Sequence, residues 1–139
     1  MSSNDAGYNP IEYHNGTVWP HDTGLIAEGF RRYGFREQAS VLALALIDAS
    51  SSFAYRLPEV FAGFSREESG FPVEYPTASR PQAWAAGAIL LAIRTLLGLD
   101  ATDEGLSVAA HLPDPISDLK LERVPVRGRR IDALAGPRA

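Results

Sequence analysis

Apolar residues recur at helical spacing in the first third of the chain, which predicts two helices joined by a short turn. One helix is expected over residues 22–33. A second is expected over residues 36–53, where every residue from 41 to 47 is Val, Leu, Ala or Ile. A helix that is apolar all round is buried on several sides. Because only Gly34 and Phe35 separate the two helices, they should form an antiparallel hairpin.

A third helix is predicted between Ser79 and Gly98. Ser79 is suited to the N-cap, Pro81 to the first turn and Gly98 to the C-terminal stop. The small residues at 85–88 would let another helix or a ligand approach closely. Two of the three helices are apolar nearly all round, yet three helices cannot enclose one another. The pattern therefore predicts a piece of a larger helical assembly.

The segment between the second and third helices, residues 55–78, is rich in proline, glycine and aromatic residues. It should form a long loop without regular structure, and such loops in compact domains are usually functional. We assign no function to the polar stretch within it, residues 65–70.

After the third helix the pattern changes to an alternation of apolar and polar residues, at 106–108 and 119–124. A tight turn at 126–129 leads into the last alternating stretch. We therefore expect a helical part over residues 1–99 and a tail over residues 100–139. The tail is too small for a second core and should form a short β-hairpin packed on the helices.

Composition narrows the possible classes of protein. The chain has 139 residues, of which 45% are hydrophobic, enough for one domain. A net charge of −4 without a basic stripe disfavours a nucleic-acid partner. The absence of cysteine excludes disulfides and thiolate metal sites. The longest apolar stretch, residues 83–93, is shorter than the roughly 20 residues of a membrane span. No signal peptide is visible, so we expect a cytoplasmic protein without a membrane partner.

Residues 13–22 read YHNGTVWPHD and are dense in side chains that bind sugars. Trp and Tyr rings stack on the apolar faces of pyranose rings, while Asn, His and Asp bond to hydroxyl groups. A structural loop with Trp19 in a core is an equal alternative. A metal site of His14, His21 and Asp22 is a third interpretation, although this spacing matches no common metal site.

Two further clusters carry candidate chemistry. Glu59 stands alone in the apolar, aromatic segment LPEVFAGF, where burial would raise its pKa and suit it to proton transfer. The alternative is a solvated loop carboxylate or a helix cap. Gln82 and Trp84, in PQAWAAG, fall in the first turn of the third helix, where a pocket floor could lie. Trp84 alone would equally suit a core position.

The ordered motifs YHNGxVWPHD, LPExFxGF and PVxYPxAxxPQAWAAG resemble the carboxyl-terminal part of the bacterial glycogen-debranching (amylo-α-1,6-glucosidase) family, which is related to glucoamylases, trehalases and mannosylglycerate hydrolases. The resemblance covers about residues 7–99. It implies a mainly α fold, a partial (α/α)6 toroid of the six-hairpin glycosidases with the β-hairpin as its tail. It further implies hydrolysis of α-glucosidic bonds with inversion, by a carboxylic acid and a carboxylate base, without a cofactor.

The resemblance also assigns roles to residues. It makes Glu59 the general base. It places these residues at the sugar subsite or in support of it: His14, Asn15, Gly16, Trp19, Gln82 and Trp84. It extends less directly to His21, Asp22 and Tyr75, and Asp22 is equally suited to capping its helix.

The family's general acid lies upstream of the matched region. We therefore expect the chain to be inactive alone, with an α-glucan or another small glycoside as substrate and the missing N-terminal part of the same toroid as partner. Met1 stands only seven residues before Tyr8, which suggests an internal start or a truncated gene. Two alternatives stay open: a non-catalytic carbohydrate-binding or accessory fragment, and a helical interaction module or oligomer.

Overall fold

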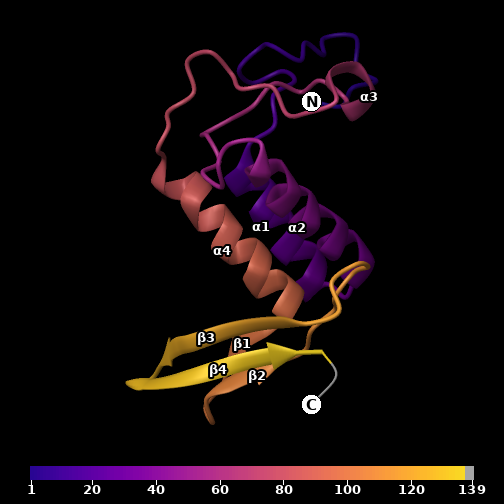
Figure 1. Cartoon of the computed structure of the whole chain (residues 1–139). Helices are drawn as coiled ribbons and strands as arrows, with labels where there is room; N and C mark the ends of the chain where they lie inside the picture. Colours follow the sequence, from indigo (N-terminus) through magenta and orange to yellow (C-terminus); the bar gives the residue numbers. More distant parts are fainter. Residues whose placement is uncertain (137–139) are drawn as a thin grey trace.

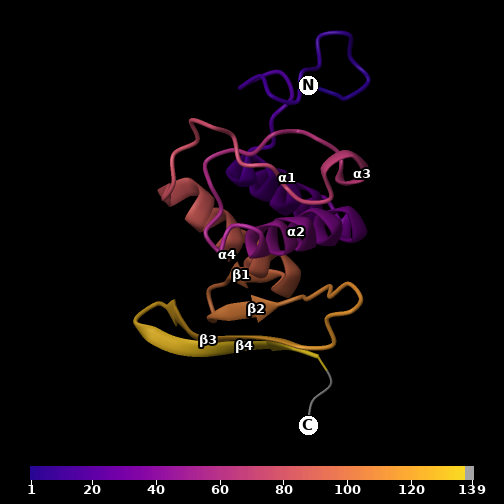
Figure 2. The same ribbon diagram turned by 45° about the horizontal axis from the view of Figure 1, so that its top comes forward.

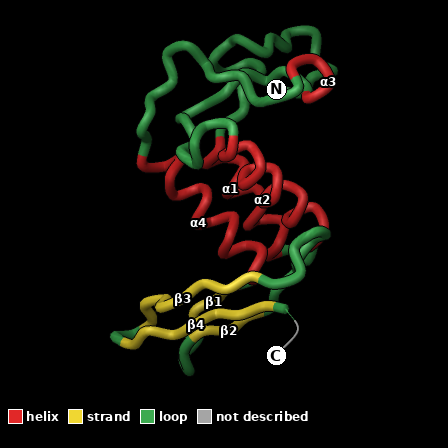
Figure 3. The backbone as a smooth tube through the Cα atoms, viewed as in Figure 1, coloured by secondary structure: helices red, strands yellow, loops and turns green. Residues whose placement is uncertain are grey.

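The computed structural model describes residues 1–136, which are stacked in three layers (Figure 1). Loops and a one-turn helix form one end, three helices form the middle, and strands form the other end (Figure 3). The same order is seen in the turned view (Figure 2). The predicted helix-rich fold with a β-structured tail is thus confirmed at this level.

The middle layer consists of helices α1 (Pro20–Arg32), α2 (Arg36–Ser51) and α4 (Ala83–Leu97). The first two lie within two residues of their predicted bounds. All three pack against one another, and Gly34 makes the turn between α1 and α2 with a φ of 86°. Within residues 1–136, no helix has the length and apolar character needed to cross a membrane.

Helix α4 starts later than predicted, because Ser79 is not its N-cap. Gln82 is the N-cap, and its side-chain oxygen accepts a hydrogen bond from the amide of Ala85 at 3.2 Å. Ser79 is instead paired with the preceding loop, since its carbonyl accepts from the amide of Glu59 at 3.0 Å. The C-terminal stop was predicted correctly: Gly98 has left-handed geometry, with a φ of 58°.

The loop over residues 55–78 contains more regular structure than predicted. Helix α3 (Arg66–Ser69) makes one turn and is fixed by a capping box between Ser65 and Glu68. The S-x-x-E spacing is a recognised signal for such a start. Phe61 forms isolated β-bridges to both Val18 and Glu74. The loop is therefore tied to the segment before α1.

The tail forms two antiparallel hairpins, where a single one was expected. Strand β1 (Leu99–Ala101) pairs with β2 (Leu106–Val108), and β3 (Leu119–Val126) pairs with β4 (Arg129–Ala135). The β3–β4 turn falls where the sequence placed it. The first hairpin was missed because β1 begins directly after the stop of α4.

The core lies where the three helices meet the loop. Its buried side chains are Ala43, Leu46, Phe53, Leu57, Phe61, Ala85, Ala92 and Leu96. A smaller cluster joins the end of α4 to the strands, through Leu97, Leu99, Ala133 and Ala135.

Within the described chain the helices are not buried on all sides, in line with the expectation that three helices cannot enclose one another. Leu25 on α1, Val41 on α2 and Leu90 on α4 are 61%, 64% and 66% exposed. Each of these helices therefore presents an apolar face to the solvent.

A partly buried ionic network joins α1 to the tail. The carboxylate of Glu28, only 7% exposed, accepts hydrogen bonds from Arg31 (2.8 Å), Arg32 (3.0 Å) and Thr95 (3.1 Å). Arg31 also donates to Asp100 at 2.8 and 2.9 Å. Burial opposes ionisation of Glu28, but the bonds from the two arginines outweigh it and lower its pKa to about 2.

Candidate functional site

The residues of the three motifs meet at an open cavity of about 240 Å³ beside the N-terminal ends of α1 and α4. Its lining consists of His14, Trp19, His21, Asp22, Glu59, Gln82 and Trp84. Five of these residues are among those assigned to the site from the sequence, and His21 and Asp22 were the less direct assignments. The fold thus gathers residues from three separate segments around one space.

Glu59 is held at this cavity by hydrogen bonds to both carboxylate oxygens. The Tyr13 hydroxyl donates to one oxygen at 2.8 Å, and the backbone amide of Ser79 donates to the other at 3.1 Å. The amide of Ser79 and then the hydroxyl of Tyr13 lower the pKa of Glu59 below its usual value. The expectation that burial raises this pKa was therefore wrong. The side chain is only half-buried, and the bonds outweigh desolvation.

Glu59 is ionised at neutral pH, as a proton acceptor must be, although the lowered pKa also makes it a weaker base than an ordinary glutamate. The same hydrogen bond raises the pKa of Tyr13. The phenol therefore stays protonated and continues to donate to the carboxylate. Tyr13 and Ser79 were not assigned to the site from the sequence. Tyr13 is the first residue of the YHNG motif, and no local pattern marks the amide of Ser79.

One wall of the cavity is a fixed indole. Trp19 is stacked with the ring of His14 at a centroid distance of 5.8 Å, and Tyr13 meets it edge-on at 4.8 Å. Its Nε1 donates to the hydroxyl of Thr17 at 3.1 Å, and that hydroxyl donates to the carbonyl of Tyr13 at 2.6 Å. The ring is thus held in place while part of it stays exposed, as stacking on a sugar requires.

The N-terminal ends of α1 and α4 supply another part of the lining. Trp84 is 67% exposed, so the alternative that it fills a core is wrong. Its ring lies 4.6 Å from that of His21, whose Nε2 is 3.4 Å from Asp22. Within residues 1–136, the buried Nδ1 of His21 has no hydrogen-bond partner.

Two of the assigned residues lie outside the cavity lining. The side-chain amide of Asn15 donates to Glu12 at 2.6 Å. Gly16 is buried, and a Cβ there would lie 2.2 Å from the carbonyl oxygen of Asn9. Gly16 therefore allows two backbone segments to approach closely, which is a structural role. Tyr75 is also absent from the lining, and its ring lies 5.6 Å from that of Tyr13.

Few other polar groups of the cavity are available to a ligand or a metal ion. Gln82 uses its side-chain oxygen as the helix cap, which leaves its amide nitrogen for a ligand. Within the described part of the chain, no three His, Asp or Glu side chains converge on a possible metal position. No protein-family model matches this chain, and no curated protein matches it.

The hydrogen bond between Tyr13 and Glu59 predicts the effect of a single-atom change. Tyr13→Phe should raise the pKa of Glu59, because it removes a donor that stabilises the ionised carboxylate. Carboxyl ¹³C shifts followed by NMR through a pH titration measure this. Tyr33→Phe is the control, since Tyr33 is 85% exposed. An unchanged pKa in Tyr13→Phe would contradict the assignment of this bond.

Proposed function

We propose that the chain supplies the general base and part of the sugar-binding wall of an inverting glycoside hydrolase that acts on α-glucosidic bonds. It would be the C-terminal part of a glycogen-debranching-like (α/α)6 toroid. The observation that carries the proposal is an ionised carboxylate, Glu59, at a cavity bounded by the indoles of Trp19 and Trp84. The resemblance of the three motifs to the debranching family agrees with it.

In this reaction Glu59 takes a proton from a water molecule as the water attacks the anomeric carbon. A carboxylic acid on the other face of the sugar must protonate the leaving oxygen, at about 6.5–9.5 Å from the base. Among the described residues, Asp22 is the other carboxylate in the lining. It lies in the first turn of α1, with an oxygen 3.4 Å from the Nε2 of His21. In the debranching family that the motifs resemble, the acid lies upstream of the matched region, so we place the acid outside these residues.

An apolar groove beside the cavity supports the proposal that further helices cover this part. The groove, of about 450 Å³, runs between α1 and α4 and shares His21, Asp22 and Trp84 with the cavity. Leu25 and Leu91 continue it along the two helices. Exposed apolar surface of this kind marks an interaction face. In the proposed toroid, the missing N-terminal part would lie there.

One observation favours a second function, that of a non-catalytic carbohydrate-binding fragment. Both oxygens of Glu59 already accept hydrogen bonds from the protein. Such a carboxylate could serve only to hold the loops of Tyr13 and Ser79 together. The aromatic wall would still bind a saccharide.

A substrate that needs little acid assistance separates the two functions. Fluoride leaves readily, so the purified chain should hydrolyse α-glucosyl fluoride to β-glucose while leaving maltose and isomaltose intact. Proton NMR of the initial product gives its anomeric form, and calorimetric titration with maltose measures binding. Binding of maltose without turnover of the fluoride would favour the second function. If the chain neither binds maltose nor hydrolyses the fluoride, both proposed functions are overturned.

A further inference from the structure

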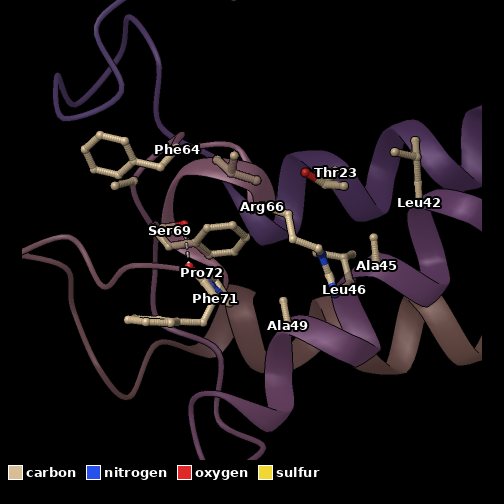
Figure 4. Close-up of a pocket in the computed structure, with 13 residues that line it drawn as sticks. Thr23, Leu42, Ala45, Leu46, Ala49, Phe64, Arg66, Ser69, Phe71 and Pro72 are labelled. Atoms are coloured by element: carbon tan, nitrogen blue, oxygen red, sulfur yellow. Dashed lines mark hydrogen bonds between the residues drawn. The ribbon is translucent and has the colours of Figure 1, made fainter.

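A second cavity lies beneath α3 and shares no lining residue with the candidate saccharide site (Figure 4). Its volume is about 340 Å³, within the range of small-molecule pockets. Its walls are mostly apolar and come from α2 and from the loop. The side chains that define them are Leu42, Leu46, Ala49, Phe61, Phe64 and Phe71.

The lining of this cavity includes one cationic side chain, that of Arg66. Arg66 extends from α3 toward the side chains of α2 (Figure 4), and its Nη2 pairs with Asp48. Among the described residues, its Nε and Nη1 have no acceptor. Arg31 shows what a guanidinium can hold in this fold, because it binds two carboxylates at once, Glu28 and Asp100. Arg66 therefore has a free edge for a second carboxylate, the geometry that guanidinium groups prefer.

The other polar side chains of the lining are already used as donors. The hydroxyl of Thr23 donates to the carbonyl of Trp19 at 2.9 Å. The hydroxyl of Ser69 donates to the carbonyl of Phe71 at 2.8 Å. Arg66 is thus the side chain in the lining that has free donors, which favours an acceptor with negative charge.

We propose that this cavity binds a small amphipathic carboxylate. Its hydrocarbon part lies between the phenyl rings and α2, and its carboxylate lies at the mouth on the free edge of Arg66. The side chain of Arg66 is 75% exposed, so the charged group stays in contact with water and avoids a large desolvation cost. The apolar tail supplies most of the affinity, and the charge supplies selectivity.

The full chain, titrated with three probes, tests this proposal. Octanoate should bind and shift the NMR signals of Phe61, Phe64 and Phe71. Octan-1-ol has a similar tail without the charge and should bind about two- to fivefold more weakly, as expected for an exposed ion pair. Acetate, which lacks the tail, should not bind. Arg66→Gln should bring octanoate to the level of octan-1-ol, while Arg56→Gln, an exposed arginine outside the cavity lining, should change nothing.

A filled cavity provides the independent control. Ala49→Leu should abolish octanoate binding while the circular dichroism spectrum and saccharide titration stay as in the original chain. Persistent binding in this variant would overturn the proposal. So would a lack of octanoate binding in the original chain, equal affinity for octanoate and octan-1-ol, or shifts confined to the groove between α1 and α4. The saccharide titration concerns the other cavity, so the two proposals can fail separately.

Discussion

Glu59→Gln is expected to lower the turnover of α-glucosyl fluoride by about 10²–10⁴-fold, the usual contribution of a general base. The amide cannot accept the proton of the attacking water. It keeps an oxygen that can accept from Tyr13 or from the amide of Ser79, so the loops should stay in place. Affinity for maltose, measured by calorimetry, should change by less than about threefold, because the variant removes a charge and retains the shape.

Glu104→Gln is the matched control for this variant, because Glu104 is exposed and lies outside the lining of the candidate site. It should leave both turnover and binding unchanged. Turnover that survives in Glu59→Gln would remove the catalytic assignment. If maltose binding were lost together with turnover, Glu59 would instead be a residue that shapes the cavity.

Glu28→Gln is expected to lower the free energy of unfolding by about 3 kcal/mol, the range found when one partner of a buried ion pair is removed. The substitution leaves Arg31 with Asp100 as its remaining anionic partner and weakens the bonds from Arg32 and Thr95. Urea unfolding followed by circular dichroism measures the change. Glu104→Gln serves again as the control, and its midpoint should not move. A change below about 0.5 kcal/mol in Glu28→Gln would show that the network contributes little.

The same carboxylate predicts how stability depends on pH. Its pKa is about 2 in the folded chain and about 4.3 in an unfolded one. A depressed folded pKa contributes stability that is fully present above pH of about 4.3 and is lost as pH falls toward 2. The contribution is roughly 3 kcal/mol. The acid limb of the stability curve should therefore be flatter in Glu28→Gln than in the original chain.

The elements that the sequence predicted well are those with local signals. Gly98 ends α4 because the stop needs a left-handed residue at that point, and Gly34 makes the tight turn between α1 and α2. The one-turn helix α3 also has a local signal, the capping box of Ser65 and Glu68, although it lies in a polar stretch without an apolar repeat. The start of α4 was misplaced because Ser79, a good cap in isolation, is engaged by Glu59.

The environment of the site could not be predicted in this way. Aromatic and carboxylate residues in the motifs indicated which side chains to consider. The state of Glu59 depends on partners 20 and 46 positions away, Ser79 and Tyr13. The residues next to Glu59 in the sequence are apolar, so on their own they predict a raised pKa for this carboxylate. The folded chain instead brings two donors to the carboxylate, which reverses the direction.

Both tryptophans of the chain, Trp19 and Trp84, line the same cavity. Intrinsic indole emission therefore reports on this one location and is nearly silent about the strands at the far end of the molecule. A saccharide that displaces water from the two rings would change the emission without any added label. Trp19→Phe and Trp84→Phe would then assign the signal to one wall or the other. The arrangement gives this protein a built-in optical reporter for ligand occupancy.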